Sequence, residues 1–139
     1  MHGKAKVILR IIDANINRAK EGLRVCEEIT RFVLNCPSLT LSLKKIRHQI
    51  DSLSGRLATK KSIFAGRQVF SDVGKKIYVN ELKRTSLRDI FFANIQRTKE
   101  SIRVLEEFSK LKDRRIAVKF KEIRYGLYEL EKKILQKIS

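Results

Sequence analysis

The sequence contains few of the residues that interrupt helices or cross-link a chain. It has one proline, six glycines and two cysteines in 139 residues. Because Pro and Gly mark turns and loops, their scarcity predicts a chain that is mostly helical. Two cysteines, Cys26 and Cys36, make no disulfide framework, and the CxxC and Cys/His spacings of zinc sites do not occur. We therefore expect a cytoplasmic protein without a structural metal.

Several common functional signatures are also absent. No apolar run approaches the roughly 18 residues that span a bilayer, and no apolar signal segment opens the chain, so we expect no membrane partner. A phosphate-binding loop is excluded because Val69 stands where a glycine is required before Gly74, and no GxGxxG occurs. With His2 and His48 as the only histidines, a Ser/His/Asp or Cys/His catalytic group is unsupported.

What the chain has in excess is positive charge. Its 32 Lys and Arg residues against 15 Asp and Glu residues give a formal net charge of +17. Such a charge is typical of proteins that bind nucleic acids or other polyanions. The richness in Lys and Glu is also typical of proteins from hot environments. A third use of positive charge is the binding of phosphorylated small molecules. No separate basic tail stands out, because lysines and glutamates are mixed along the whole chain.

A stretch of fifteen residues occurs twice. Residues 14–28 match residues 93–107 at a constant offset of 79, and ten of the fifteen positions are identical. Residues 43–50 resemble residues 120–127 at an offset of 77. Since each copy joins two amphipathic segments, the repeated unit is a helical hairpin.

Two such hairpins predict an all-α fold, an antiparallel four-helix bundle in a single domain over residues 1–139. Ser86 with Asp89 resembles a capping box, and Asp113 is expected to cap the last helix. The segment between the two hairpins, residues 58–85, contains a weak signal for a turn at residues 71–74 between two extended runs. The expected elements are hairpin repeats at 7–57 and 86–138, a first helix at 7–34, a second that begins at Pro37, a third that ends near Leu111, and an irregular connecting loop at 58–85.

The first helix of each hairpin carries a polar notch on its expected packing face. A buried arginine is costly unless an anion meets it, so two notches predict a pocket for a negatively charged ligand. A structural alternative remains open, because polar seam residues often only set register, and each arginine has a glutamate three residues later on its own helix. The notch residues are Asn15, Arg18 and Gly22 in one copy and Asn94, Arg97 and Ser101 in the other, where Gly22 and Ser101 leave clearance.

The arginines and carboxylates of the chain suit phosphoryl transfer. Guanidinium groups bind phosphates bidentately, and carboxylates hold Mg²⁺ between phosphates. Phosphoryl transfer depends mostly on positioning and charge neutralisation. If the acceptor is itself a phosphate, its oxygen is already anionic and no general base is required, which fits the shortage of histidine.

Five segments together form a longer pattern. They are Ile11-Ile12-Asp13-Ala14-Asn15-x-Asn17-Arg18-x-x-Glu21-Gly22-Leu23-Arg24-Val25-x-Glu27, Arg47-His48, Asp72-Val73-Gly74, Ala93-Asn94-x-x-Arg97-x-x-Glu100-x-x-Arg103-Val104-Leu105-Glu106-Glu107, and Arg124-Tyr125-x-Leu127-Tyr128-Glu129. With them, nearly the whole chain resembles the small helical domain that is often fused ahead of thiamine-phosphate synthase, a family that includes stand-alone members of this length.

The resemblance implies a hydroxymethylpyrimidine phosphate kinase. Such a transferase uses ATP and Mg²⁺ to convert 4-amino-5-hydroxymethyl-2-methylpyrimidine phosphate into its diphosphate in thiamine biosynthesis. It would act on the monophosphate and not on the free alcohol, because arginines without the substrate phosphate lose their partner. Glu27, Glu28, Glu106 and Glu107 are expected to be solvated or paired. We expect catalysis from Arg18 and Arg97, substrate and phosphate binding from Asn15, Asn94, Arg67, Arg47 and Arg124 (the last two alternatively pairing with acids), and metal binding from Asp72 and Glu21.

Two rival functions remain open from the sequence. A basic helical module for RNA or DNA would show salt-dependent affinity and no turnover, although the Asn/Arg pattern lies on the packing seam rather than outside. A structural bundle that dimerises through the notched face would tolerate Arg18→Leu or Arg97→Leu. Whether one chain forms the pocket or a homo-oligomer shares it is also left open.

Overall fold

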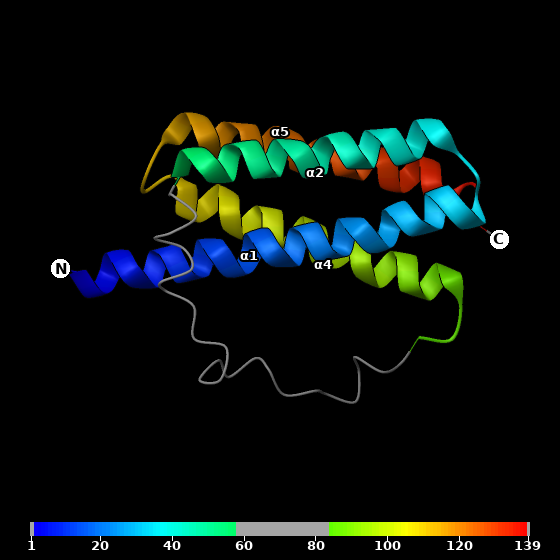
Figure 1. The fold of residues 1–139 in the computed structure, drawn as a ribbon, viewed down its shortest axis with the longest axis horizontal. Helices are drawn as coiled ribbons and strands as arrows, with labels where there is room; N and C mark the ends of the chain where they lie inside the picture. Colours follow the sequence, from blue (N-terminus) through cyan, green and yellow to red (C-terminus); the bar gives the residue numbers. More distant parts are fainter. Residues whose placement is uncertain (1, 58–83, 139) are drawn as a thin grey trace.

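The computed structural model describes residues 2–57 and 84–138, and its four long helices run along one axis (Figure 1). Neither range contains a strand, so the all-α prediction is confirmed. The predicted turn at 71–74 and nearly all of the expected loop lie outside the described residues. The elements are α1 at His2–Glu28, the π-helix η1 at Ile29–Val33, α2 at Pro37–Leu57, α4 at Leu87–Ser109 and α5 at Arg114–Leu135.

The four helices form a closed ring of antiparallel neighbours. In each hairpin the second helix folds back along the first, α2 along α1 and α5 along α4 (Figure 1). The two hairpins meet through α1 and α4, which make the most extensive contact, and through α2 and α5. None of the described helices is long and apolar enough to cross a bilayer.

The apolar stripes predicted from the sequence form the core. Burying a side chain such as Leu or Ile in this way contributes about 1.5–3 kcal/mol, which makes the stripes the main source of stability. Polar and charged residues cover the opposite side of each helix, as expected for helices packed on one face. The buried stripe residues include Leu43, Ile50 and Leu57 of α2, Ile116, Phe120 and Leu127 of α5, Ile12, Leu23 and Cys26 of α1, and Phe91, Ile95 and Leu105 of α4.

The helix ends agree closely with the local sequence signals. The Ser86 hydroxyl accepts a hydrogen bond from the Asp89 backbone N–H at 3.1 Å, and the Asp113 carboxylate accepts one from the Arg115 N–H at 2.9 Å. Only half of the expected capping box forms, because the Asp89 carboxylate accepts from the N–H and hydroxyl of Thr85 instead of the Ser86 N–H.

The first helix differs most from its prediction. It begins at His2, earlier than the expected residue 7, and its last turn is the π-helix η1. Asn35 then takes a positive φ of 49°, a left-handed conformation that Asn tolerates better than most residues and that ends the helix before Pro37.

Candidate functional site

The two copies of the repeat face each other across the α1–α4 contact. Ala19 and Thr98 occupy equivalent positions in the two copies, and the Thr98 hydroxyl donates a hydrogen bond to the Ala19 carbonyl oxygen at 3.4 Å. A contact between equivalent residues places the approximate two-fold axis of the bundle between them. The fold therefore brings the two repeated motifs into one region.

Gly22 permits the close approach of these helices. A Cβ atom at Gly22 would collide with the Thr98 hydroxyl and would lie 2.8 Å from the Asn94 carbonyl oxygen. The interpretation of Gly22 as clearance is confirmed. At the equivalent position of α4, Ser101 is buried, and its hydroxyl donates to the Arg97 carbonyl oxygen at 2.8 Å.

Asn15 and Asn94 form equivalent hydrogen bonds within their own helices. Each donates from Nδ2 to the carbonyl oxygen four residues earlier, Asn15 to Ile11 and Asn94 to Ile90, both at 2.8 Å. Asn15 is buried and Asn94 is half-buried. A side-chain amide has two N–H donors and a carbonyl acceptor, so these bonds use one donor of each amide and leave capacity for a ligand.

The expectation that Arg18 and Arg97 are buried on the packing face is wrong, because both side chains are exposed. Asn15, Gly22 and Ser101 of the notched seam are buried, so only its arginines lie at the rim of the contact. Arg18 follows Asn15 by three residues and precedes Gly22 by four, so it emerges at that rim, and Arg97 does the same from α4. Neither forms an ion pair with a residue in the two described ranges, so the alternative pairs with Glu21 and Glu100 do not form. Their catalytic role stays a prediction.

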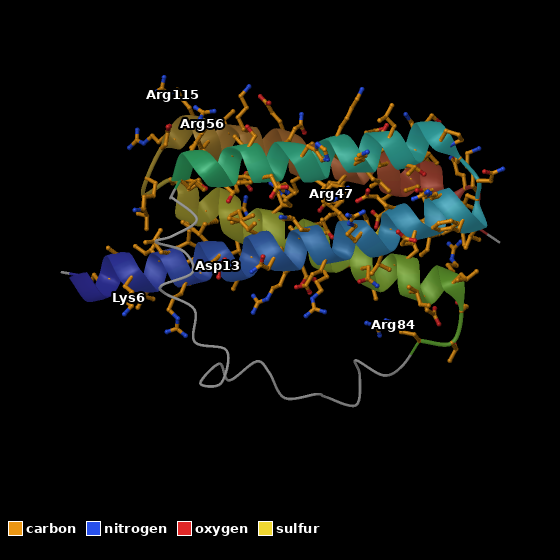
Figure 2. The ribbon with its side chains drawn as sticks, viewed as in Figure 1. Lys6, Asp13, Arg47, Arg56, Arg84 and Arg115 are labelled. Atoms are coloured by element: carbon orange, nitrogen blue, oxygen red, sulfur yellow. The ribbon has the colours of Figure 1, made fainter. Side chains whose placement is uncertain are left out.

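The other two predicted arginines are paired with buried glutamates. Arg47 donates from Nε and Nη2 to Glu27 at 2.8 and 3.1 Å, and Arg124 donates in the same way to Glu106 at 3.2 and 3.4 Å. The side chains of Arg47 and Glu27 are 12% and 6% exposed. In Figure 2, Arg47 lies between α2 and α1, whereas Arg56 and Arg115 extend from the far end of the bundle.

Two physical consequences follow from these bidentate arginine–glutamate ion pairs. The hydrogen bonds to the glutamates raise the pKa of Arg47 and of Arg124 above the usual value, which keeps both guanidinium groups charged. A guanidinium has five N–H donors, so three donors of Arg47 remain after it binds Glu27. The expected pairing with acids is therefore present, and a role of either arginine in phosphate binding stays a prediction.

The burial of Glu27 and Glu106 was not anticipated from the sequence, which placed them among solvated or paired surface residues. The signal that marks them is the repetition itself, because an acid and an arginine recur together in both hairpins. A lysine at equivalent positions also joins the helices of each hairpin, although the two acids that it contacts are not equivalent. Lys20 meets Asp51 at 2.7 Å, and the more deeply buried Lys99 meets Glu131 at 2.8 Å.

The predicted metal ligands are not brought together in the described part of the chain. Glu21 is exposed on α1, while Asp72 and the phosphate-binding candidate Arg67 lie outside the described residues. Within the described ranges, no group of three His, Cys, Asp or Glu side chains is arranged to hold a metal ion. The metal-binding role of Glu21 therefore stays a prediction.

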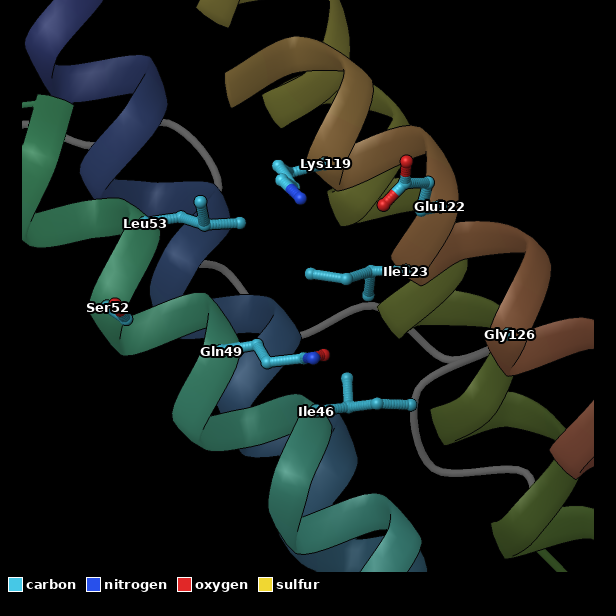
Figure 3. A pocket seen from close by; sticks show the side chains of 8 residues that line it. All are labelled: Ile46, Gln49, Ser52, Leu53, Lys119, Glu122, Ile123 and Gly126. Atoms are coloured by element: carbon cyan, nitrogen blue, oxygen red, sulfur yellow. The ribbon is translucent and has the colours of Figure 1, made fainter. Parts of the chain in front are cut away.

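Two grooves flank α2 on opposite sides. A groove of about 300 Å³ separates α2 from α5, and Figure 3 shows Leu53, Gln49 and Ile46 of α2 pointing across it towards Ile123 and Lys119 of α5. A larger groove of about 620 Å³ lies where α2 meets α1 and η1. The second groove is lined by Arg24, Glu27, Glu28, Arg31, Thr40, Lys44, Arg47 and His48.

Comparison with known proteins identifies the family. The sequence pattern of the ThiD2 family matches residues 10–133, which include the repeated motifs of α1 and α4 and both arginine–glutamate pairs. The chain belongs to the ThiD2 family. This ThiD2 match confirms the resemblance to a small helical family, and no solved structure matches the chain significantly.

The relatives of this ThiD2 chain include longer proteins named thiamine-phosphate synthase. The one from Nostoc punctiforme is 37% identical over 131 residues, which are 94% of this chain and 36% of that protein. Those from Synechocystis sp. and Rhodopirellula baltica are each 38% identical, over 92% and 96% of this chain and 36% of the relative. The ThiD2 chain thus spans about a third of the length of the relatives it matches.

Proposed function

We propose that this ThiD2-family protein is a hydroxymethylpyrimidine phosphate kinase of thiamine biosynthesis. It would transfer a phosphoryl group from ATP to 4-amino-5-hydroxymethyl-2-methylpyrimidine phosphate and form the diphosphate. The observation that carries the proposal is the ThiD2 match over residues 10–133, a region shared with relatives named thiamine-phosphate synthase. The match concerns one region of those relatives, and the kinase is the function that the motifs of this region support best.

The rim between α1 and α4 is the proposed place of transfer. Arg18 and Arg97 lie on either side of the approximate two-fold axis, exposed and without an ion pair inside the described ranges. Two guanidinium groups so placed would hold the acceptor phosphate and the γ-phosphoryl group and neutralise charge as it moves. This gives Arg18 and Arg97 the roles that the sequence predicted.

The reaction requires no base from the protein. An oxygen of the acceptor phosphate attacks the γ-phosphorus of ATP, the bond from that phosphorus to the β–γ bridging oxygen breaks, and ADP leaves. The attacking oxygen is already anionic, so no proton has to be removed. Mg²⁺ between the ATP phosphates would reduce their charge, and Glu21 on the same helix as Arg18 is the described carboxylate that fits it.

Selectivity is proposed to come from the notch asparagines and from the arginines. An aminopyrimidine presents a ring nitrogen beside an amino group, an edge that a side-chain amide can match with one donor and one acceptor. Asn15 and Asn94 each retain such a pair after bonding to their own helix. The free alcohol would leave the rim arginines without a phosphate and would be a poor substrate.

The decisive experiment is a turnover assay with ATP, Mg²⁺ and the pyrimidine monophosphate, with the free alcohol as parallel substrate. We expect diphosphate formation from the monophosphate alone. Arg18→Gln and Arg97→Gln should lower kcat/KM by about 100-fold or more with the fold retained, since each removes charge stabilisation at the transferred group. Arg56→Gln, at the end of the bundle, is the matched control. Absence of turnover by the folded wild-type protein would overturn the proposal.

The nucleic-acid-binding alternative is not favoured, because the family match connects the chain to relatives named for a small-molecule reaction. It predicts affinity for oligonucleotides that falls steeply with salt, together with no kinase turnover. The same preparation can therefore decide between the two functions.

A further inference from the structure

The basic groove between α1, η1 and α2 is separate from the proposed transfer site. Arg18 and Arg24 are six residues apart on α1, and Arg31 lies seven residues further on, so the groove extends about 10–20 Å along the helix from Arg18. The groove opens beside α2, whereas the rim arginines lie at the contact with α4. We propose that this groove, which we call the η1 groove, binds a linear oligophosphate anion.

The charges of the η1 groove are unbalanced. Glu27 is neutralised by Arg47 through two hydrogen bonds. The remaining cationic side chains are those of Arg24, Arg31 and Lys44, and only Glu28 opposes them. None of these three cations makes an ion pair within the described ranges, although the Arg31 guanidinium stacks on the Phe32 ring with 4.8 Å to its centroid. A concave surface with excess positive charge attracts anions more strongly than a flat one.

Arg47 supplies a fixed donor at the floor of the η1 groove. Glu27 holds two of its N–H groups, and the side chain is only 12% exposed, so its orientation is set before any ligand arrives. Its three other N–H groups are available for an anion. A donor that is already oriented loses less entropy when it binds, which favours affinity.

The second hairpin provides an internal comparison, because it carries the same set of charges but pairs two of the equivalent cations with its own glutamates. Arg103, equivalent to Arg24, contacts Glu106 and Glu107, both at 3.0 Å. Lys110, equivalent to Arg31, contacts Glu107 at 3.0 Å. In the first hairpin the corresponding cations remain unpaired. The two hairpins thus differ in whether the cations at these two pairs of equivalent positions form ion pairs within the protein.

The π-helix marks the same difference. η1 carries Arg31 and borders the groove, whereas the equivalent part of α4 ends as an ordinary helix at Ser109. π-helical turns are rare and occur frequently at functional sites. The unpaired charges and the π-helical turn therefore fall in the same copy and on the same groove.

The spread of the cations selects the class of anion. Arg24 and Arg31 are about 10 Å apart along the helix axis, with Lys44 and Arg47 facing them from α2. A single phosphate reaches only part of this row, while a chain of phosphates contacts several of the cations together. The volume of about 620 Å³ lies in the range typical of small-molecule sites. Nucleoside triphosphates and inorganic polyphosphate share this chemistry.

The test is calorimetric titration of the full chain with inorganic tripolyphosphate at about 0.15 M NaCl, where diffuse attraction is largely screened. The double substitution Arg24→Ala/Lys44→Ala should weaken binding by about tenfold or more, because two charge-assisted contacts are lost. The matched control is Arg103→Ala/Lys121→Ala at the equivalent positions of the second hairpin, which removes the same charge. Circular dichroism confirms that each variant is folded.

Titrations with ATP and with orthophosphate identify which kind of phosphate compound the groove binds. ATP binding as tightly as tripolyphosphate supports recognition of the phosphate chain alone, and orthophosphate should bind at least about tenfold more weakly because it reaches fewer cations. Equal weakening in the groove and control variants, or no binding of tripolyphosphate by the wild-type protein, overturns the proposal. So does an effect of the groove substitutions on oligonucleotide binding with none on tripolyphosphate. Because binding is read directly, the result is independent of kinase turnover.

Discussion

At the residue scale, the smallest side chains determine how closely α1 and α4 approach. The Cβ position of Gly22 is occupied by atoms of Thr98 and by the Asn94 backbone, which leaves no space for a methyl group. The backbone carbonyl cannot move without shifting α4. This close contact lies beside the proposed transfer site, so stability and function share it.

We expect Gly22→Ala to destabilise the protein by about 1–3 kcal/mol, the usual cost of overpacking a close contact. Gly126→Ala is the control, since nothing lies within 4 Å of a Cβ built at Gly126. That substitution should be neutral or stabilise α5 by up to about 1 kcal/mol through helix propensity. Urea denaturation of the two variants measures both effects, and equal changes would contradict this account of Gly22.

The two cysteines should differ sharply in reactivity. Burial, with smaller contributions from Glu27 and Glu131, raises the pKa of Cys26 to about 12, so its thiol stays protonated near neutral pH. The hydrogen bond with the Ser38 hydroxyl lowers the pKa of the partly exposed Cys36, which increases its thiolate fraction. Iodoacetamide at about pH 7.5 should therefore modify Cys36 first, because the thiolate is the nucleophile.

Peptide mapping by mass spectrometry after timed quenching measures this difference. In denaturant both cysteines should react at similar rates, because the unfolded chain removes both environments. Faster labelling of Cys26 in the native protein would contradict the buried position of that thiol.

At the element scale, each hairpin is held by an apolar stripe and by a buried ion pair. Arg47 and Glu27 connect α2 to α1, and Arg124 and Glu106 connect α5 to α4. Such a pair adds little net stability compared with a well-packed apolar pair, yet it is costly to break from one side. It fixes how the two helices are aligned.

We therefore expect Glu27→Gln to destabilise the protein by about 3 kcal/mol, because it leaves the Arg47 charge buried without its counter-ion. The double variant Glu27→Leu/Arg47→Met should recover most of the lost stability, since neither charge remains. Glu107→Gln is the control, because Glu107 forms its ion pairs at an exposed position. Thermal and urea unfolding test these expectations, and a double variant less stable than Glu27→Gln would show that the pair itself is stabilising.

At the scale of the whole molecule, the net charge of +17 is the dominant electrostatic feature. The exposed pairs neutralise only part of it, and many lysines and arginines of the described helices face solvent. Like charges on a compact chain repel one another and oppose folding.

Raising the NaCl concentration from about 0.01 to 0.15 M should raise Tm, because the screening length falls from about 30 to 8 Å. Tripolyphosphate at equal ionic strength should raise Tm further if it binds the η1 groove, since a ligand that binds only the folded state stabilises it. Differential scanning calorimetry separates the two effects. A Tm that falls with NaCl would show that attractive pairs outweigh the repulsion.

The family assignment and the fold follow from features that a sequence carries locally. The 4,3 spacing of apolar residues in α2 and α5, the caps at Ser86 and Asp113, and the repeat at an offset of 79 each depend on residues within a few turns or on self-similarity. Helical periodicity states which residues share a face, and a repeated hairpin with apolar faces has few ways to bury them. These features were sufficient to predict the bundle.

Tertiary packing decided what each polar residue on those faces does. Whether Arg18 lies inside the α1–α4 contact or at its rim depends on the rotation of α1 against α4, which Gly22 and the apolar stripe set together. The pairing of Glu27 with Arg47, twenty residues apart in the chain, depends on the alignment of α1 and α2. Whether equivalent cations of the two hairpins form ion pairs depends on such contacts as well. A side chain at the edge of a helix face has no local signal for its partner, because that partner comes from another helix.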